Sequence, residues 1–470
     1  MIDDNYISLT PEEQQFLPAN IAWHFKVVPK SIVDGEIWLY IDREQNLALI
    51  KEEVEVILGS EVNFEKIDGK AIIKALGKYY RQAKNEKDTE LKINSETDFV
   101  DRIIQEANAL GSSDIHIEIY ENKGRVRIRI DGHLIERYKV PVESYPELVN
   151  KIKIKSNLDI SEKRLPQDGR IQYGNFDIRV SILPTLHGEK IVLRILGQDA
   201  TGISINSLGM TSIERSNYLE GIKKPNGIIL ISGPTGSGKT TTLYATLKLL
   251  NEEKRNIVTV EDPIEYTLEG INQVQLKEDI GLTFTSALRS FLRQDPDVIM
   301  LGEIRDAETA QMAIRAALTG HLVLSTIHTN SAWGTVSRLI DMGVPSFLLA
   351  NTLNSSVAQR LVRKLCNYCK EESKVDLKSL PVTFPIEKAP KHQFISVGCE
   401  SCHYTGYNGR QAIYEIITIQ GELTNRIKNK DLNVEMLLKA NNIKSLSDRA
   451  LELWSDGTTT LEEIYSLLIE

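Results

Sequence analysis

The sequence lacks the features that mark secreted or membrane-spanning chains. It has only four cysteines, all between positions 366 and 402, so no disulfide framework extends over its length. No apolar run approaches the length of a membrane-spanning helix. The first residues, MIDDNYISLTPEEQQ, are acidic and polar, unlike a secretory signal. We therefore expect a cytoplasmic protein that attaches to a membrane only peripherally, through a partner.

Positive charge is also scarce relative to negative charge. The chain carries 56 Lys and Arg against 65 Asp and Glu, a net charge of −9 at neutral pH. Since nucleic-acid binding depends on neutralising phosphates, this balance predicts no direct contact with nucleic acid. The 41% hydrophobic and 26% charged residues are typical of a soluble globular protein. At 470 residues the chain is long enough for about three domains.

A phosphate-binding loop stands near the middle of the sequence. The stretch NGIILISGPTGSGKTTT, residues 226–242, contains the pattern G-x-x-x-x-G-K-[ST] between an apolar strand and a predicted helix. In this setting backbone N–H groups and the helix dipole face one anion, Lys239 reaches the β/γ-phosphates, and Thr240 holds Mg²⁺. We expect ATP to be bound by Gly233, Pro234, Thr235, Gly236, Ser237, Gly238, Lys239, Thr240 and Thr241.

Three further apolar strands follow the loop, at residues 256–260, 297–301 and 321–328. Because they alternate with helical stretches, they predict a parallel, right-handed, helix-covered α/β sheet. Ligands bind at the carboxyl ends of such strands. The polar residues that these strands deliver to their ends include Glu261, Glu303 and His328.

These three residues, with Lys239, form the predicted catalytic set. Hydrolysis of a γ-phosphate needs Mg²⁺, a water molecule held in line, and positive charge on the phosphoryl oxygens. We assign the water to Glu261 and the magnesium shell to Glu303, and the two roles are open to exchange. His328 either contacts the γ-phosphate or carries a signal to the next subunit.

Arginines gather in two regions. Arg289, Arg293 and Arg305 surround the third of the four strands, and in a ring-forming ATPase such an arginine stabilises transition-state charge in another subunit or domain. Upstream, the strand at residues 125–130 alternates three arginines with apolar residues, so the arginines share one face. Arg164, Arg170, Arg179 and Arg194 add to this basic character. Each arginine alone is typical of a solvated sheet face, whereas the whole set favours an anion held at a domain or subunit boundary.

The cysteines form two C-x2-C pairs, Cys366 with Cys369 and Cys399 with Cys402. Paired knuckles of this kind supply four thiolates to a tetrahedral Zn²⁺ and leave no open position, so we predict a structural zinc site. Redox use of a single C-x2-C pair is the alternative.

Composition and motifs together divide the chain into segments. Residues 81–97 are polar, highly charged and free of large aromatics, as in a linker or a solvated helix. The predicted segments are a small N-terminal docking domain at 1–80, the linker at 81–97, a second N-terminal α+β domain at 98–204, the ATPase core at 205–360, a zinc-binding subdomain at 361–412 and a C-terminal helical region at 413–470. From residue 403 onward the sequence predicts mostly helix.

Together these motifs resemble the ATPases that power type II secretion and type IV pilus assembly, the GspE/PilB family. The phosphate loop is similar to the family's Walker A motif, VEDPIE at 260–265 to its aspartate box, DPDVIMLGEIRD at 295–306 to its Walker B motif, and TGHLVLSTIHTN at 319–330 to its histidine box. The two cysteine pairs, with residues 406–410, resemble its zinc subdomain. The resemblance covers residues 95–470, with a fainter likeness at 15–80.

The resemblance implies a RecA-like P-loop ATPase domain preceded by a PAS-like α+β domain. It also implies a homo-hexamer that converts ATP hydrolysis into domain rotation, with an inner-membrane platform protein and a cytoplasmic docking protein as partners. Arg179 and Arg194 match arginines that the family directs toward bound nucleotide. Arginines that it places near the nucleotide or the subunit boundary match Arg289, Arg293, Arg305 and Arg410. The family's retraction motors lack the four-cysteine insert, so its presence favours secretion or pilus extension.

Two other classes of function are open to test. A nucleic-acid-translocating RecA-like motor, including one for DNA uptake, would show DNA-stimulated hydrolysis with a strong salt dependence, and the acidic balance argues against it. A nucleotide-sensing scaffold that does not hydrolyse ATP is disfavoured by the complete phosphate loop and both carboxylate boxes. The sequence does not separate protein secretion from pilus extension or competence.

Overall fold

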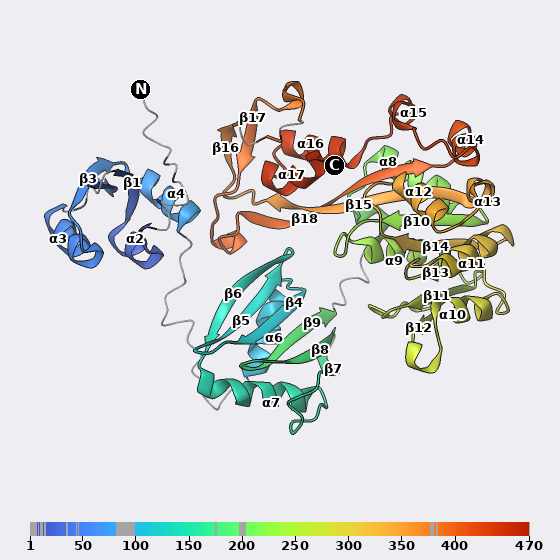
Figure 1. Cartoon of the computed structure of the whole chain (residues 1–470), viewed down its shortest axis with the longest axis horizontal. Helices are drawn as coiled ribbons and strands as arrows, with labels where there is room; N and C mark the ends of the chain where they lie inside the picture. The colour runs from blue at the N-terminus through green and yellow to red at the C-terminus, as the bar shows by residue number, and fades with distance from the viewer. Residues whose placement is uncertain are drawn as a thin grey trace.

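Figure 1 shows the computed structural model of the chain, in which three larger sheets follow one another and a two-stranded hairpin is inserted between two strands of the third sheet. The structure describes residues 16–80, 99–196, 204–376 and 384–469, apart from short gaps at 34–35, 44, 46 and 174–175, and also residues 7, 9, 13, 380 and 381. The predicted linker at 81–97 lies outside the described residues. None of the helices in these ranges combines the length and the apolar character of a membrane span.

The N-terminal part is a three-stranded sheet flanked by helices. Its elements are α2 (Ala19–Phe25), β1 (Val27–Val33), β2 (Glu36–Asp42), α3 (Leu47–Leu58), β3 (Val62–Ile67) and α4 (Gly69–Tyr79). β2 pairs antiparallel with β1 and parallel with β3. Alternation along β2 buries Ile37, Leu39 and Ile41, as expected for this predicted strand. These residues belong to a hydrophobic core of their own.

The second part is a six-stranded antiparallel sheet with the strand order β6-β5-β4-β9-β8-β7. Its elements are α6 (Phe99–Ala109), β4 (Asp114–Ile119), β5 (Gly124–Ile130), β6 (His133–Val140), α7 (Tyr145–Lys155), β7 (Gln167–Tyr173), β8 (Phe176–Thr185) and β9 (Gly188–Leu196). The apolar residues of α6 and α7 share one core with the sheet. The helices therefore cover one face and leave the other to polar side chains.

The uncovered face carries the arginines of β5. Arg125 and Arg127 both contact the carboxylate of Glu118 on β4, at 2.8 Å each, and Arg129 lies 3.3 Å from Asp114. Burial alone would raise the pKa of Glu118, but the hydrogen bonds and charges of Arg127 and Arg125 lower that pKa to about 2. The balancing anions thus belong to the sheet itself. These three arginines are therefore paired within the sheet, and the expectation of an anion at a domain or subunit boundary, made for the larger set of arginines, stays a prediction.

The third part is a seven-stranded sheet with helices on both faces (Figure 1). Its elements are α8 (Ser212–Ile222), β10 (Gly227–Ser232), α9 (Lys239–Leu250), β11 (Ile257–Glu261), β12 (Asn272–Gln275), α10 (Phe284–Phe291), β13 (Val298–Leu301), α11 (Ala307–Leu318), β14 (Leu322–Ile327), α12 (Gly334–Asp341), α13 (Ser346–Thr352), β15 (Leu353–Leu365) and β18 (Tyr407–Thr418). The strand order is β12-β11-β13-β14-β10-β15-β18. All neighbouring strands are parallel except the antiparallel pair β15 and β18.

The apolar runs of the sequence explain this sheet. Every residue of β10, β13 and β14 is buried, as in parallel strands covered on both faces. In register, Ser232 lies beside Ile327, and Leu301 lies beside both Val260 and Ser325. The carboxyl ends of four strands therefore meet at one edge, as the sequence predicted.

The strand β18 corrects one prediction. Residues 403–470 were expected to be mostly helical, but Tyr407–Thr418 forms a long strand along β15, and the predicted boundary at residue 412 falls inside it. The pairing is between segments far apart in the chain, so a local pattern does not reveal it. Between the two strands lies the hairpin of β16 (Glu371–Lys374) and β17 (His392–Ile395). Helices do follow β18, at α14 (Glu422–Lys428), α15 (Glu435–Ala440), α16 (Leu446–Ser455) and α17 (Leu461–Ile469).

Candidate nucleotide-binding and catalytic site

The glycine loop lies between the end of β10 and the first turn of α9. Gly233, Gly236 and Gly238 have φ angles of 147°, 81° and 86°, where side chains other than hydrogen are disfavoured. Space is short as well: a Cβ on Gly233 would lie 2.5 Å from the carbonyl oxygen of Gln359, and one on Gly238 would lie 2.8 Å from its Nε2. Both positions therefore require glycine.

Gln359 of β15 holds this loop in place through two hydrogen bonds of its side chain. Its side chain is buried, its Nε2 donates to the Ser237 carbonyl oxygen at 2.8 Å, and its Oε1 accepts from the Thr242 hydroxyl at 2.9 Å. No sequence motif indicated this residue. Gln359-Arg360 is a polar pair between Val357-Ala358 and Leu361-Val362, but no local pattern connects the pair with the phosphate loop.

Lys239 lies over the loop at the start of α9. Its ammonium donates to the carbonyl oxygens of Gly233 and Pro234, at 2.8 and 3.0 Å. Burial lowers the pKa of Lys239, the charge of Glu303 acts in the opposite direction, and the charge of Arg360 adds to the lowering. The ammonium is thus within electrostatic reach of a carboxylate that follows β13. Thr240, the predicted magnesium ligand, is exposed on the same turn.

Glu261 ends β11 as a buried carboxylate with its hydrogen bonds already made. Oε1 accepts from the Thr259 hydroxyl at 2.6 Å and from Gln273 Nε2 at 3.1 Å, and Oε2 accepts from the phenol of Tyr244. Burial, followed by the charge of Glu261, raises the pKa of Tyr244, so this phenol remains a donor. A carboxylate with three protein donors has little capacity left for a water molecule.

Glu303 lies two residues beyond β13 and is more open. Its side chain is 19% exposed, pairs with Arg305, and brings Oε2 to 3.3 Å from His328 Nε2. Of the predicted catalytic set, the structure therefore gathers Lys239, Glu303 and His328 on one side of the strand ends. Glu261 lies deeper, inside its own hydrogen-bond network.

The arginines around β13 separate into two groups. Arg305 contacts Glu303 and lies 3.6 Å from Asp262, beside the strand ends. Arg289 and Arg293 are exposed, and Arg293 Nη1 donates to the carbonyl oxygen of Arg289 at 2.9 Å. Of these three arginines, Arg305 is the one that contacts the predicted catalytic carboxylate, Glu303, within one chain.

Arg179 and Arg194 approach from the second sheet, where they lie opposite each other on β8 and β9. The Arg179 guanidinium donates to the carbonyl oxygen of Ile264, and Arg194 Nε donates to Asp114 at 3.1 Å. Both line a cavity of about 1310 Å³ between this sheet and residues 263–267. The structure thus places both arginines at the aspartate box.

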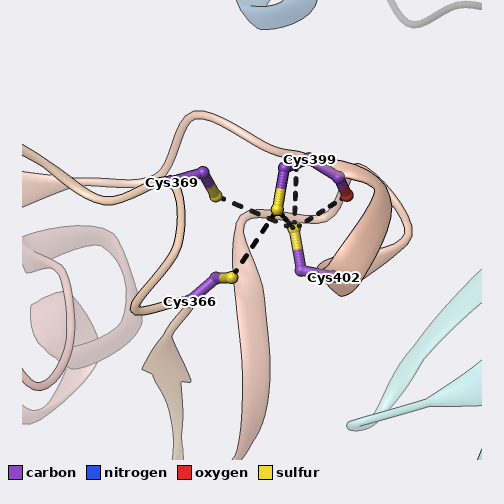
Figure 2. A group of neighbouring side chains, drawn as sticks. All are labelled: Cys366, Cys369, Cys399 and Cys402. Carbon is purple, nitrogen blue, oxygen red and sulfur yellow. Dashed lines mark hydrogen bonds between the residues drawn. The ribbon is translucent and has the colours of Figure 1, made fainter.

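Figure 2 shows the four cysteine side chains pointing toward one another. Their Sγ atoms lie within 4.8 Å of one another, with Cys366–Cys399 and Cys369–Cys402 at 3.8 Å and Cys399–Cys402 at 3.7 Å. Four sulfurs at about 2.3 Å from a tetrahedral Zn²⁺ would be about 3.8 Å apart. Backbone N–H groups donate to the sulfurs of Cys369 and Cys402 at 3.3 Å. The group therefore fits a tetrahedral metal ion.

The fold and the loop together define a class. A parallel sheet whose strand β10 runs through a glycine loop into a helix, with carboxylates at the ends of neighbouring strands, is a P-loop nucleotide-hydrolase architecture. Residues 90–466 match the family model described as "Type II/IV secretion system protein". The chain belongs to this family of secretion ATPases.

Individual relatives agree with this assignment. The chain is 46% identical to type II secretion system protein E of Pseudomonas aeruginosa, over 78% of this chain and 74% of that one. It is 47% identical to the type IV pilus assembly ATPase PilB of Myxococcus xanthus, over 78% and 66% of the two chains. The crystal structure of the pilus retraction motor PilT with bound ADP aligns with a TM-score of 0.55 and 27% identity, over 79% of this chain and 97% of that one. The predicted type II secretion or type IV pilus ATPase is confirmed.

Replacing Gln359 by Leu tests the support beneath the loop. Leucine is close to glutamine in size but leaves the Ser237 carbonyl and the Thr242 hydroxyl without their partner, at a cost of about 1–3 kcal/mol for a buried polar group. We expect ADP binding to weaken on the order of tenfold, as 1.4 kcal/mol implies. Titration with a fluorescent ADP analogue measures this. The exposed Gln172→Leu is the control, and unchanged affinity in Gln359→Leu would contradict the assigned role.

Proposed function

We propose that this chain is a ring-forming motor that hydrolyses ATP to drive the assembly of pilin-like subunits, in a type II secretion or pilus-extension machine. The observation that carries the proposal is the grouping of Lys239, Glu303, His328 and Arg305 at the strand ends beside a complete phosphate loop. The secretion and pilus ATPases among its relatives support the direction of the work.

ATP binding is assigned to the phosphate loop. Backbone N–H groups and the N-terminus of α9 face the phosphates, and the Lys239 ammonium exchanges its two carbonyl acceptors for phosphate oxygens. The exposed Thr240 hydroxyl fits a ligand of Mg²⁺, which supplies charge neutralisation when bound. Gln359 keeps the loop in the shape that these contacts require.

Glu303, not Glu261, is proposed to orient the attacking water. Glu303 is partly exposed and its partners are two surface side chains, so it can turn toward a water molecule without opening a buried network. His328 steadies its second oxygen or approaches the γ-phosphate. Glu261 is proposed as a positioning residue that ties β11 to α9 through Tyr244.

The remaining arginines are proposed to act between parts of the assembly. Arg179 and Arg194 face the cavity above the aspartate box, so closure of this cavity around a nucleotide would bring both to its phosphates. The exposed Arg289 and Arg293 suit a subunit boundary. We therefore propose a homo-hexamer that works at the cytoplasmic side of the inner membrane, with a platform protein and a docking protein.

The cysteine group is proposed to hold one structural Zn²⁺. Four thiolates leave no open position, so the metal would stabilise the fold locally and take no part in hydrolysis. The insert also favours secretion or pilus extension over retraction.

The two carboxylates can be separated by substitution. We expect Glu303→Gln to lower kcat about 10²–10⁴-fold, the usual contribution of a group that handles the reacting proton, while nucleotide binding persists. Glu261→Gln keeps an acceptor for its donors and should lower kcat much less. Steady-state ATPase assays with circular dichroism as a folding check measure both. Turnover close to wild type in Glu303→Gln, or a folded Glu261→Gln with the deeper loss, would reverse the assignment.

The metal assignment has its own test. Elemental analysis of the purified chain should find one zinc per protomer, and Cys399→Ser should lose it together with thermal stability. Ser401→Ala, a change between two of the ligands that removes no thiolate, is the control and should retain the metal. A native protein with no bound metal and an oxidised Cys pair would instead establish the redox alternative.

A further inference from the structure

The turn at residues 329–332 affects the position of the residue before it, His328. Residues 329–332 connect β14 to α12 and directly follow this histidine. His328 Nε2 lies 3.3 Å from Glu303 Oε2, so a shift of the turn changes the surroundings of the carboxylate. The turn is therefore part of the geometry on which hydrolysis depends.

Buried side chains from β15 and β18 hold the backbone of this turn. Arg360 Nη2 donates to the Asn330 carbonyl oxygen at 3.1 Å, and the Ala332 N–H donates to the Glu415 carboxylate at 3.2 Å. The Ser356 hydroxyl donates to the Ala332 carbonyl oxygen at 2.7 Å. The turn thus has fixed partners at both of its ends.

Arg360 and Glu415, which we call the clamp, carry charges that are almost completely buried. Arg360 is 9% and Glu415 is 6% exposed, and because Glu415 pairs with Ala358, the two charged residues are diagonal neighbours on one face of the sheet. Burial raises the pKa of Glu415, and the backbone N–H groups of Ala332, Leu446 and Trp333, followed by the charge of Arg360, oppose the rise. Two buried charges rarely stabilise a fold more than apolar residues of similar size would. We therefore attribute the presence of both charges here to a need for geometry.

Arg360 also connects the turn to the phosphate loop. It lines a cavity of about 510 Å³ together with His328, Gly233 and Pro234. Its charge is one of the causes that lower the pKa of Lys239, after burial and the opposing effect of Glu303. The guanidinium is thus close to both sides of the site.

We propose that Arg360 and Glu415 are positioning residues for ATP hydrolysis, which fix the turn 329–332 and thereby hold His328 against Glu303. The inference rests on the proposed roles of Glu303 and His328. Both clamp residues hold the backbone of the turn through their side chains, so their loss should affect turnover more than nucleotide binding.

A double-mutant cycle on the full chain tests this. Arg360→Met removes the donors and keeps the length of the side chain. We expect it to lower kcat on the order of 10- to 100-fold, as small displacements of reacting groups do, with KM for ATP nearly unchanged. In a His328→Ala background the same substitution should have no further effect, because there is no histidine left to position. Arg360→Lys, which keeps one donor for Asn330, should recover part of the loss.

The controls separate a positioning role from a general loss of structure. Arg338→Met makes the same change at an exposed position on α12 and should leave kcat unchanged. If Arg360→Met lowers kcat by the same factor with and without His328, or raises KM at constant kcat, the positioning role is overturned. Should Arg360→Met fail to fold, Glu415→Leu, which removes the acceptor for the Ala332 N–H, replaces it. Glu415→Gln, whose amide oxygen still accepts this bond, should then recover part of the loss. The same pattern supports the proposal, and the same additivity overturns it.

ATP turnover by the wild-type chain distinguishes a failure of the clamp proposal from a failure of the proposed function. If the wild-type chain hydrolyses ATP and Lys239→Ala does not, the proposed function stands and the cycle reports on the clamp alone. Absence of turnover in the wild-type hexamer would overturn the proposed function and the clamp together.

Discussion

The close approach of β15 to the phosphate loop is the contact on which the rest of the site depends. The backbone of Gln359 excludes any side chain at Gly233, and its amide joins the loop to the first turns of α9. The next residue, Arg360, points to the opposite face and reaches the turn after His328. Since side chains alternate along a strand, one dipeptide can serve the phosphate loop on one face and the histidine turn on the other. The spacing of nucleotide and catalytic groups is therefore set by the register of β15 against β10.

This dependence explains which parts the sequence could predict. The phosphate loop is a local pattern, and its glycines, Lys239 and the flanking strand and helix lie in one short stretch. The parallel sheet could be predicted because its strands are apolar on both faces and alternate with helices. Gln359 and Glu415 could not be found in this way, because their partners lie elsewhere in the chain. The strand β18 was missed for the same reason: its partner β15 lies far away in the sequence, on the other side of the hairpin of β16 and β17.

The position of the cysteine group between β15 and β18 suggests what a metal there would do for the fold. It closes the excursion that separates β15 from β18, the two strands that carry Arg360 and Glu415. At the root of the excursion, the Arg363 guanidinium lies 3.8 Å from the ring centroid of Tyr407 and 2.5 Å from the carboxylate of Glu463 on α17. A metal bound by the two C-x2-C turns would lower the entropy cost of closing this long loop. It would thus contribute to the register of β15 and β18, at a distance from the phosphates.

The contrast between the two glutamates can be weighed in energies. The ion pair of Glu303 with Arg305 is half-exposed on the arginine side, and pairs of this kind contribute only about 0–1 kcal/mol. Under the proposed roles, opening this pair would free Arg305 for phosphate charge and Glu303 for a water molecule. The hydrogen bonds of Glu261 are buried, and leaving a buried polar group without its partner costs about 1–3 kcal/mol. In the proposed role, the carboxylate of Glu303 would change partners in every cycle of hydrolysis, and at the end of β13 this change has a small energetic cost.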